Sequence, residues 1–361
     1  MEGDTMYCRN GYLYTLAICL FLLNTACGNS TKQLTCPTAQ SRDKVLWPFA
    51  PTSPWNMPIG SRATYQPAGF QRADWIAIDR DYFYWSGTLR ELRANGEWPA
   101  KCTGHTLIDS VRIPNGALIM PEGKNSASAF LMPDGRTIVQ GNPTARCDST
   151  GPVYVGWSAP TEDIFGDGLH GGHGGSGLSS IGGTLRLGEL TSRQCQPAYE
   201  PVIRHVLKVD IDARRYCSRI NDGYRWPAAR SDEYSATEYD RYGTAVPGVR
   251  MGALLALPAD LDLASLQLQT EPARRLACTF QDYGAYVADD AGWHVFYLCV
   301  ENGVPEEFQR TYGYDIEATE GPWYEDMMRI FTHLCVVDNN SVENVGGGGQ
   351  PRQPLAPPFR N

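Results

Sequence analysis

Hydrophobic and polar residues alternate along several short stretches of the chain, a pattern typical of β-strands. From residue 106 onward, four such stretches end at turn residues: LIDSVRIP, GALIMP, SAFLMPDGRTIVQGNP and PVYVGW. The pair Asp134–Gly135 between two apolar runs indicates a β-hairpin. A further strand-like run, MGALLALP, covers residues 251–258. These runs predict a mainly β (α+β) fold with an antiparallel β-sandwich or jelly-roll-like core.

Helical spacing of apolar residues marks other parts of the chain. It covers residues 271–283 and 323–334, and a shorter instance lies around Leu89, Leu92 and Arg93. We therefore expect two or three helices at the periphery of the β core. The run IRHVLKVDID, residues 203–212, fits either a buried strand or a short helix.

Proline and glycine are concentrated in particular segments. Proline recurs every few residues from 46 to 67, which predicts an extended arm over the domain, held by Trp47, Phe49 and Trp55. The tail from residue 346 holds four consecutive glycines and several prolines, so we expect it to be irregular. The predicted organisation is a signal peptide over residues 1–26, a tether over 27–43, one globular domain over 44–345 and a tail over 346–361.

The N-terminal region predicts export. The apolar run from Tyr12 to Leu23 follows Arg9 and is too short to span a bilayer, but it has the length of a signal-peptide core. The sequence that follows resembles a bacterial lipobox ending at Cys27, although Asn24 stands where that pattern has leucine. We expect lipidation of Cys27 or ordinary cleavage nearby. The protein would then be an outer-membrane-anchored lipoprotein or extracellular.

Composition and charge exclude several classes of protein. The chain of 361 residues contains 9 Trp, 19 Tyr and 11 Phe, more aromatic side chains than a disordered protein carries. The formal net charge of -9 provides no basic surface for nucleic acid. Contact with a membrane is expected only through the N-terminal lipid.

The cysteines fit an exported protein. The chain has 11, of which Cys8 and Cys19 would leave with the signal peptide and Cys27 would carry lipid. An even number remains, and it predicts four disulfides of unknown connectivity. No CxxC pair suggests a zinc site, and no cysteine is expected to be free for catalysis. The remaining cysteines are Cys36, Cys102, Cys147, Cys195, Cys217, Cys278, Cys299 and Cys335.

A glycine-rich segment, residues 166–190, is the first candidate site. Asp163 and Asp167 lie close to His170 and His173 in the sequence, and glycines flank both histidines. Glycine allows the backbone to approach a ligand closely. Three interpretations remain open: a structural loop, histidines that contact a sugar or act in catalysis, and a divalent metal at Asp167, His170 and His173.

Three other sites contain residues suited to carbohydrate chemistry. Aromatic and charged residues that could stack on and bind sugars are Tyr224, Arg225, Trp226 and Asp232. His205 could act as an acid or base if it faces a cleft. A junction between a helix and a strand carries Gln281, Asp282 and Tyr283. Glycoside hydrolysis needs two carboxyl groups, for which we expect Asp282 with Asp163 or Asp167.

Several motifs resemble those of a group of secreted proteins from bacteria and some lower eukaryotes. They include HGGSGLSSIGGTLRLGEL, YRWPA and QDYGAYVADD, and the resemblance covers most of the mature chain. It implies an exported single-domain protein and points to His205, Asp232 and residues 281–283. It implies no particular reaction.

The leading hypothesis from the sequence is an exported carbohydrate-active enzyme that acts on a polysaccharide or oligosaccharide. A glycoside hydrolase is favoured over a polysaccharide lyase because carboxylates are plentiful. A lyase would use His205, His170 or His173 with Tyr224, and a positive or polar side chain such as Arg225 or Gln281 would neutralise the uronate. The alternative is a non-catalytic surface lipoprotein that binds a glycan or a protein partner.

Overall fold

The computed structural model describes residues 40–121, 123–191, 203–232, 235, 242–243 and 246–360. The predicted signal peptide, Cys27, most of the tether, Cys36 and Cys195 lie outside these residues. Thirteen strands form one mixed sheet, in the order β1-β13-β10-β11-β9-β12-β2-β5-β6-β7-β3-β4, with β8 paired to β6. The strands are β1 (Tyr65–Pro67), β2 (Trp75–Tyr84), β3 (Thr88–Ala94), β4 (Thr106–Ile113), β5 (Ser128–Leu131), β6 (Thr137–Ala145), β7 (Val153–Ser158), β8 (Glu162–Asp163), β9 (Leu207–Ile211), β10 (Leu254–Ala256), β11 (Ala285–Asp290), β12 (Val295–Glu301) and β13 (Cys335–Val337).

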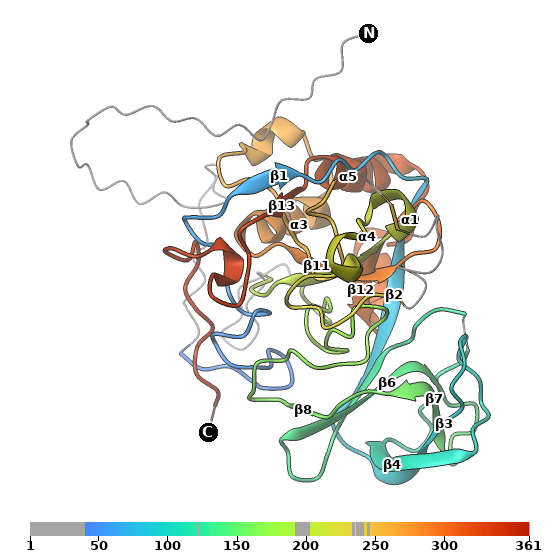
Figure 1. Ribbon diagram of the computed structural model, residues 1–361. Coiled ribbons are helices and arrows are strands. Elements are labelled where there is room, and N and C mark those ends of the chain that lie inside the picture. Colours follow the sequence, from blue (N-terminus) through green and yellow to red (C-terminus); the bar gives the residue numbers. More distant parts are fainter. Residues whose placement is uncertain are drawn as a thin grey trace, which may run out of the picture.

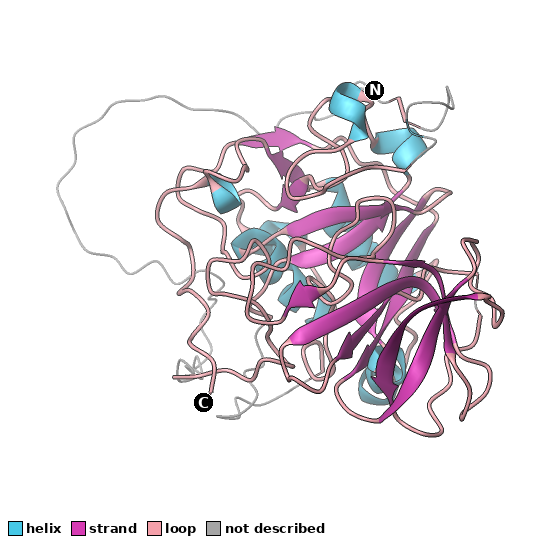
Figure 2. Cartoon of the chain, turned by 60° about the horizontal axis from the view of Figure 1, so that its bottom comes forward, coloured by secondary structure: helices cyan, strands magenta, loops and turns pink. Residues whose placement is uncertain are grey.

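The prediction of a mainly β fold with helices at the periphery is confirmed. The described α-helices are α1 (Ala213–Tyr216), α3 (Glu271–Asp282), α4 (Val304–Tyr312) and α5 (Gly321–Thr332). Short 3₁₀ turns cover Ile220–Gly223, Leu263–Leu266 and Val345–Gly347. None of the described helices is long and apolar enough to cross a bilayer. Loops account for much of the remaining chain (Figure 2).

The sheet is mixed, whereas we expected antiparallel pairing. Strand β2 runs parallel to β12 and β5, β9 runs parallel to β11, and β3 runs parallel to β7. Parallel neighbours need a crossover of a dozen residues or more, and the long segments between these strands supply it. Alternation of side chains along a strand carries no information on the direction of its neighbours.

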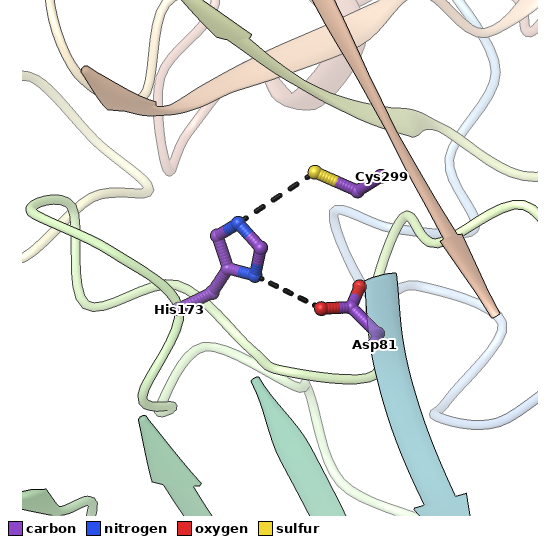
Figure 3. A group of neighbouring side chains, drawn as sticks. All are labelled: Asp81, His173 and Cys299. Carbon is purple, nitrogen blue, oxygen red and sulfur yellow. Dashed lines mark hydrogen bonds and ion pairs between the residues drawn. The ribbon is translucent and has the colours of Figure 1, made fainter. Parts of the chain in front are cut away.

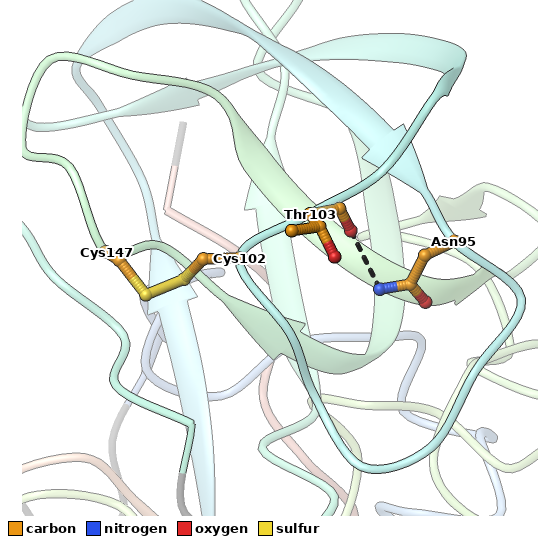
Figure 4. The surroundings of a disulfide bond; sticks show 4 residues. All are labelled: Asn95, Cys102, Thr103 and Cys147. Atoms are coloured by element: carbon orange, nitrogen blue, oxygen red, sulfur yellow. Dashed lines mark hydrogen bonds between the residues drawn. A yellow bond between two sulfur atoms is a disulfide. The ribbon is translucent and has the colours of Figure 1, made fainter.

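Strand β2 joins two parts of the molecule (Figure 1). The larger part contains the four helices, and the smaller part contains β3, β4, β6 and β7. The smaller part has its own apolar core, built from Leu92, Val111, Ile113, Phe130, Val139, Val153 and Val155. It also holds the disulfide Cys102–Cys147, beside which the Asn95 side chain donates a hydrogen bond to the carbonyl of Thr103 at 2.9 Å (Figure 4).

Most local predictions agree with the structure, and one is wrong. The hairpin at Asp134–Gly135 is confirmed, with β5 and β6 antiparallel around it. Helices α3 and α5 cover the two longer segments of helical spacing, and β9 shows that residues 207–211 form a buried strand. The short helical pattern around Leu89 is in fact strand β3, where Leu92 is buried and Leu89 is 52% exposed. Pairing with β4 and β7 outweighs a pattern of only three residues.

The proline-rich arm is anchored as predicted for two of its three aromatic residues. Phe49 and Trp55 are buried in the main core, while Trp47 is half-buried. The Trp55 indole donates to the carbonyl of Gly168 at 2.7 Å, which connects the arm to the glycine-rich segment. Ahead of the arm, Arg42 pairs with residues near the C-terminus, and its guanidinium lies 3.8 Å from the centre of the Phe359 ring.

The prediction that all eight remaining cysteines form disulfides is wrong. Cys102 is bonded to Cys147, and Cys278 and Cys335 are also in disulfides. Cys217 and Cys299 are free, buried thiols. Cys217 belongs to the main apolar core, and Cys299 faces polar side chains rather than another sulfur. An even count of cysteines therefore does not fix their pairing.

Candidate functional site

The centre of the sheet has one apolar face and one polar face, both buried. In β2, β9 and β12 the apolar face carries the alternating residues Ile76, Ile78, Leu207, Val209, Ile211, Phe296, Leu298 and Val300. It packs on helix α5, where the rings of Phe296 and Phe331 stack with centroids 4.2 Å apart. Because successive side chains of a strand point to opposite faces, the intervening residues share the other face. These residues are Ala77 and the polar Asp79, Asp81, Lys208, Asp210, Tyr297 and Cys299.

Strand register brings the polar residues together. Cys299 pairs with Asp79, and Asp210 pairs with Tyr297 on one side and Asp289 of β11 on the other. Four acidic residues, Cys299, His173 and Lys208 form a group that we call the buried cluster. Its members are 0–6% exposed: Asp79, Asp81, His173, Lys208, Asp210, Asp289 and Cys299.

The glycine-rich segment covers the polar face and contributes His173. The imidazole lies among three carboxylates: Nδ1 is 3.3 Å from Asp81 Oδ1, and Nε2 is 3.5 Å from Asp210 Oδ1 and 3.8 Å from Asp79 Oδ2. Nε2 is also 3.6 Å from the sulfur of Cys299 (Figure 3). Burial lowers the pKa of His173 and so does Lys208, but the acidic neighbours outweigh them, and the pKa lies well above its ordinary value.

Glycine is required where the segment meets the sheet. Gly174 has φ of +54°, and a Cβ there would overlap the carboxyl group of Asp289. The next residue, Gly175, donates its backbone N–H to Asp289 Oδ1 at 2.6 Å. Without side chains at these two positions, the backbone can lie directly on the acidic residues.

Asp81 and Lys208 form a fully buried ion pair. The Lys208 ammonium is 3.0 Å from Asp81 Oδ2 and donates to the carbonyls of Ser179 and Ser180 at 3.1 and 3.0 Å. The Thr184 hydroxyl also donates to Asp81. Burial alone would raise the pKa of Asp81, but Lys208 and His173 lower it below its ordinary value. Asp81 is therefore an ionised carboxylate beside His173.

The other carboxyl groups have fewer positive neighbours. Burial raises the pKa of Asp79 to about 7, against the positive charge of His173 and with the help of Asp210. Burial, with Asp232 and Asp210, raises the pKa of Asp289 well above its ordinary value. The Oδ1 atom of Asp79 is buried and accepts no hydrogen bond, which is costly for a carboxylate.

The order Cys299, His173, Asp81 has the geometry of a cysteine nucleophile with its base and orienting acid. The burial argues against that role. Cys299 is 0% exposed. Its burial raises the pKa of the thiol, and the nearby Asp210 raises it further. An activated nucleophile requires a lowered pKa and access to the substrate.

The carboxyl pair Asp79 and Asp210 meets one requirement for glycoside hydrolysis but not another. Their nearest oxygens lie within 4.8 Å of each other and of a His173 ring nitrogen, so the two carboxyl groups are close neighbours, as in retaining glycosidases. However, Asp79 is 2% and Asp210 is 3% exposed. A sugar ring needs an open cleft, and neither residue lines the pocket beside Trp55 and His205 or the pocket beside Pro258 and His333.

The carboxylates expected to form a hydrolytic pair lie elsewhere and have separate partners. Asp282 binds the guanidinium of Arg352 at 3.2 Å and the amide of Gln353 at 2.7 Å. Burial raises the pKa of Asp282, although Arg352 opposes the shift. Asp163 pairs with Arg136, and Asp167 is an exposed residue that caps the backbone of Leu169.

The predicted histidines also separate. His173 enters the buried cluster, whereas His170 is exposed. A group with metal-ligand spacing does contain His173, but with Asp79 and Asp210 in place of Asp167 and His170. His205 Nε2 lies 3.0 Å from Glu189, and Nδ1 is 2.9 Å from the carbonyl of Val206, so both ring nitrogens are engaged.

Among the residues expected to bind sugar, Asp232 lies nearest to the buried cluster. It accepts a hydrogen bond from the Tyr242 hydroxyl at 2.6 Å, and a Cβ on Gly175 would overlap its carboxyl group. Arg225 donates to the carbonyls of Asp338 and Asn340, and Gln281 donates to those of Pro258 and Leu261. Tyr283 is buried, and Tyr224 and Trp226 are half-buried.

Sequence reasoning missed Asp79, Asp81 and Asp210, although a signal was present. The runs IAIDRDY and LKVDI place charged residues two apart within apolar strands, so that each strand carries a charged face. When one face of a strand is apolar and the other is charged, the charged face is usually exposed to solvent. Only the tertiary structure shows that the charged faces of β2 and β9 are covered. The chain matches no family model, no curated protein and no solved structure.

Proposed function

We propose that the protein is an exported glycan-binding protein and that the smaller β part carries its binding face. The observation that supports this proposal is a pair of exposed tryptophans at one edge of that part. Trp98 is 55% and Trp157 is 51% exposed. A tryptophan ring exposed to this extent suits stacking on the apolar face of a sugar.

Backbone pairing places the two tryptophans at the same edge. Gly96 donates a hydrogen bond to the carbonyl of Gly156 at 2.8 Å, and Asn95 donates to that of Val155 at 3.1 Å. Trp157 directly follows Gly156, and Trp98 lies two residues after Gly96. The disulfide between Cys102 and Cys147 ties the loop after Trp98 to the loop between β6 and β7, the strand that carries Trp157.

Binding is favoured over catalysis because the carboxyl groups best placed for hydrolysis are not accessible. Asp79 and Asp210 are buried beneath the glycine-rich segment, and Asp282 and Asp163 are each neutralised by an arginine. The enzymatic hypothesis from the sequence stays a prediction. Export is supported by the disulfides, which persist in oxidising compartments.

A panel of soluble polysaccharides, tested by affinity electrophoresis, tests the proposal. We expect at least one glycan to retard the purified oxidised chain, and Trp98→Ala and Trp157→Ala each to weaken this binding by about tenfold, because each removes a stacking surface worth roughly 1 kcal/mol or more. Trp293→Ala is the matched control, since Trp293 is 53% exposed on the larger part.

The same panel is read for reducing ends and for unsaturated uronates. Release of product at a rate unaffected by Trp98→Ala would favour the enzymatic hypothesis over the binding proposal. If Trp293→Ala abolished binding and Trp98→Ala left it intact, the glycan would bind to the larger part, and the proposed binding face would be refuted. No retardation by any glycan would refute the proposal.

A further inference from the structure

We propose that the buried cluster is a site for a four-coordinate transition-metal dication, best suited to Zn²⁺, with Asp79, His173, Asp210 and Cys299 as ligands. The site lies in the larger part and is independent of the proposed glycan-binding face. A cation at this position would join strands β2, β9 and β12 to the glycine-rich segment.

The distances between the donor atoms match a tetrahedral site. Bonds of 2.0–2.3 Å from zinc to nitrogen, oxygen and sulfur place neighbouring donors about 3.3–3.8 Å apart. His173 Nε2 is 3.5 Å from Asp210 Oδ1, 3.8 Å from Asp79 Oδ2 and 3.6 Å from Cys299 Sγ. The sulfur is 3.7 Å from Asp210 Oδ1. These four of the six separations fall within the tetrahedral range, and the carboxyl oxygens of Asp79 and Asp210 lie within 4.8 Å of each other.

Burial and a missing hydrogen bond indicate that Asp79 and Asp210 have too little positive charge around them. Oδ1 of Asp79 is inaccessible to solvent and accepts no hydrogen bond. Lys208 does not fill this need, because its ammonium is engaged by Asp81 and by the carbonyls of Ser179 and Ser180. Asp79 and Asp210 therefore face the single charge of the His173 imidazolium and the neutral thiol of Cys299, and a dication would neutralise both carboxylates.

The surroundings of His173 are those of a metal ligand. Nε2 faces the donors named above, and Nδ1 faces Asp81 at 3.3 Å. A histidine that binds a metal commonly directs its other ring nitrogen to a carboxylate, which fixes the orientation of the ring. Lys208 and Thr184 hold Asp81 in turn, so the orienting carboxylate is itself positioned.

The types of donor select the metal. Calcium and magnesium prefer oxygen donors alone, whereas nitrogen and sulfur donors favour zinc and its neighbours among the transition metals. Binding would form bonds from the metal to the Cys299 sulfur and to His173 Nε2, and both the thiol proton and the Nε2 proton would leave to solvent. With four protein ligands the site would be closed, and such sites stabilise a fold rather than activate water.

The test begins with metal added to the full, purified and oxidised chain. Elemental analysis is expected to find one zinc per chain after incubation with ZnCl₂ and removal of the excess. With CoCl₂ in place of zinc, a tetrahedral site with one thiolate is expected to give visible d–d bands and a thiolate-to-cobalt charge-transfer band. A cobalt spectrum of an octahedral site without the charge-transfer band would overturn the assignment.

Variants locate the ion. Cys299→Ser is expected to remove the charge-transfer band, and Asp79→Asn is expected to weaken cobalt binding by at least about tenfold. Cys217→Ser is the matched control, because Cys217 is the second free and buried thiol among the described residues. Loss of the band in the Cys217 variant, or wild-type binding by both ligand variants, would refute the site.

The wild-type chain decides the question even where a variant fails to fold. Less than one tenth of an equivalent of zinc or cobalt, bound by a chain with a cooperative unfolding transition, would overturn the proposal. Glycan retardation is measured on the same samples. If the chain binds glycan but no metal, the metal-site proposal has failed. If it binds metal but no glycan, the proposed function has failed.

Discussion

Replacement of Lys208 by methionine is expected to destabilise the protein strongly. Methionine fills a similar volume, but it removes the Lys208 ammonium from Asp81 and from the carbonyls of Ser179 and Ser180. Asp81 is 0% and Lys208 is 1% exposed, so water cannot replace the ammonium. Breaking a buried pair in this way costs about 3–5 kcal/mol, a large part of the roughly 5–15 kcal/mol that stabilises a domain.

Urea unfolding followed by fluorescence measures the loss. A double-mutant cycle with Asp81→Asn separates the pair from its surroundings, and the double variant is expected to lose less than the sum of the two single variants. Arg93→Met is the control, because Arg93 and Glu91 form an ion pair on the surface with side chains 30% and 49% exposed. Its removal is expected to cost less than about 1 kcal/mol. A Lys208→Met loss as small as that of Arg93→Met would refute the reasoning.

Further predictions concern pH, covalent links and packing. Burial lowers the pKa of His205, but Glu189 outweighs burial and raises that pKa above its ordinary value. The pair therefore stabilises the fold below about pH 6.5 and loses this contribution as the pH rises through the folded pKa. The melting temperatures of the wild type and of His205→Gln should converge at alkaline pH. Replacing both Cys102 and Cys147 by serine opens a link across 45 residues and is expected to cost about 4 kcal/mol in urea unfolding, and a cost near zero would contradict the entropic argument. Phe331→Ala removes a ring stacked at 4.2 Å and is expected to cost about 3–5 kcal/mol by the same assay, whereas a cost below about 1 kcal/mol would show that the apolar face repacks.

Local elements could be predicted where a short pattern carries the information. The turn at Asp134–Gly135 needs a positive φ, which glycine supplies, and the hairpin forms there. Helices α3 and α5 have apolar residues at helical spacing over 12 residues each, long enough to identify them. Residues 88–94 could not be identified in this way, because their structure depends on pairing with β4 and β7.

The candidate site was predictable only in part, because it is assembled from distant segments. His173 drew attention through the glycines around it, and those glycines are what allow the segment to lie on the sheet. Its partners Asp79 and Asp210 lie on strands that become neighbours of β12 only in the folded chain. Parallel pairing of β2 with β12 is the decisive feature, and no local pattern encodes it.

The polar face of the sheet has a consequence for how the chain folds. Strand β2 is synthesised early, whereas β12, which lies between β2 and β9, is synthesised only after most of the chain. Until then Asp79 and Asp81 have no covered environment, and burying them early would be unfavourable. Contacts between such distant segments slow folding. The sheet centre is therefore expected to close late, as a single cooperative step in which the strands and the glycine-rich segment come together.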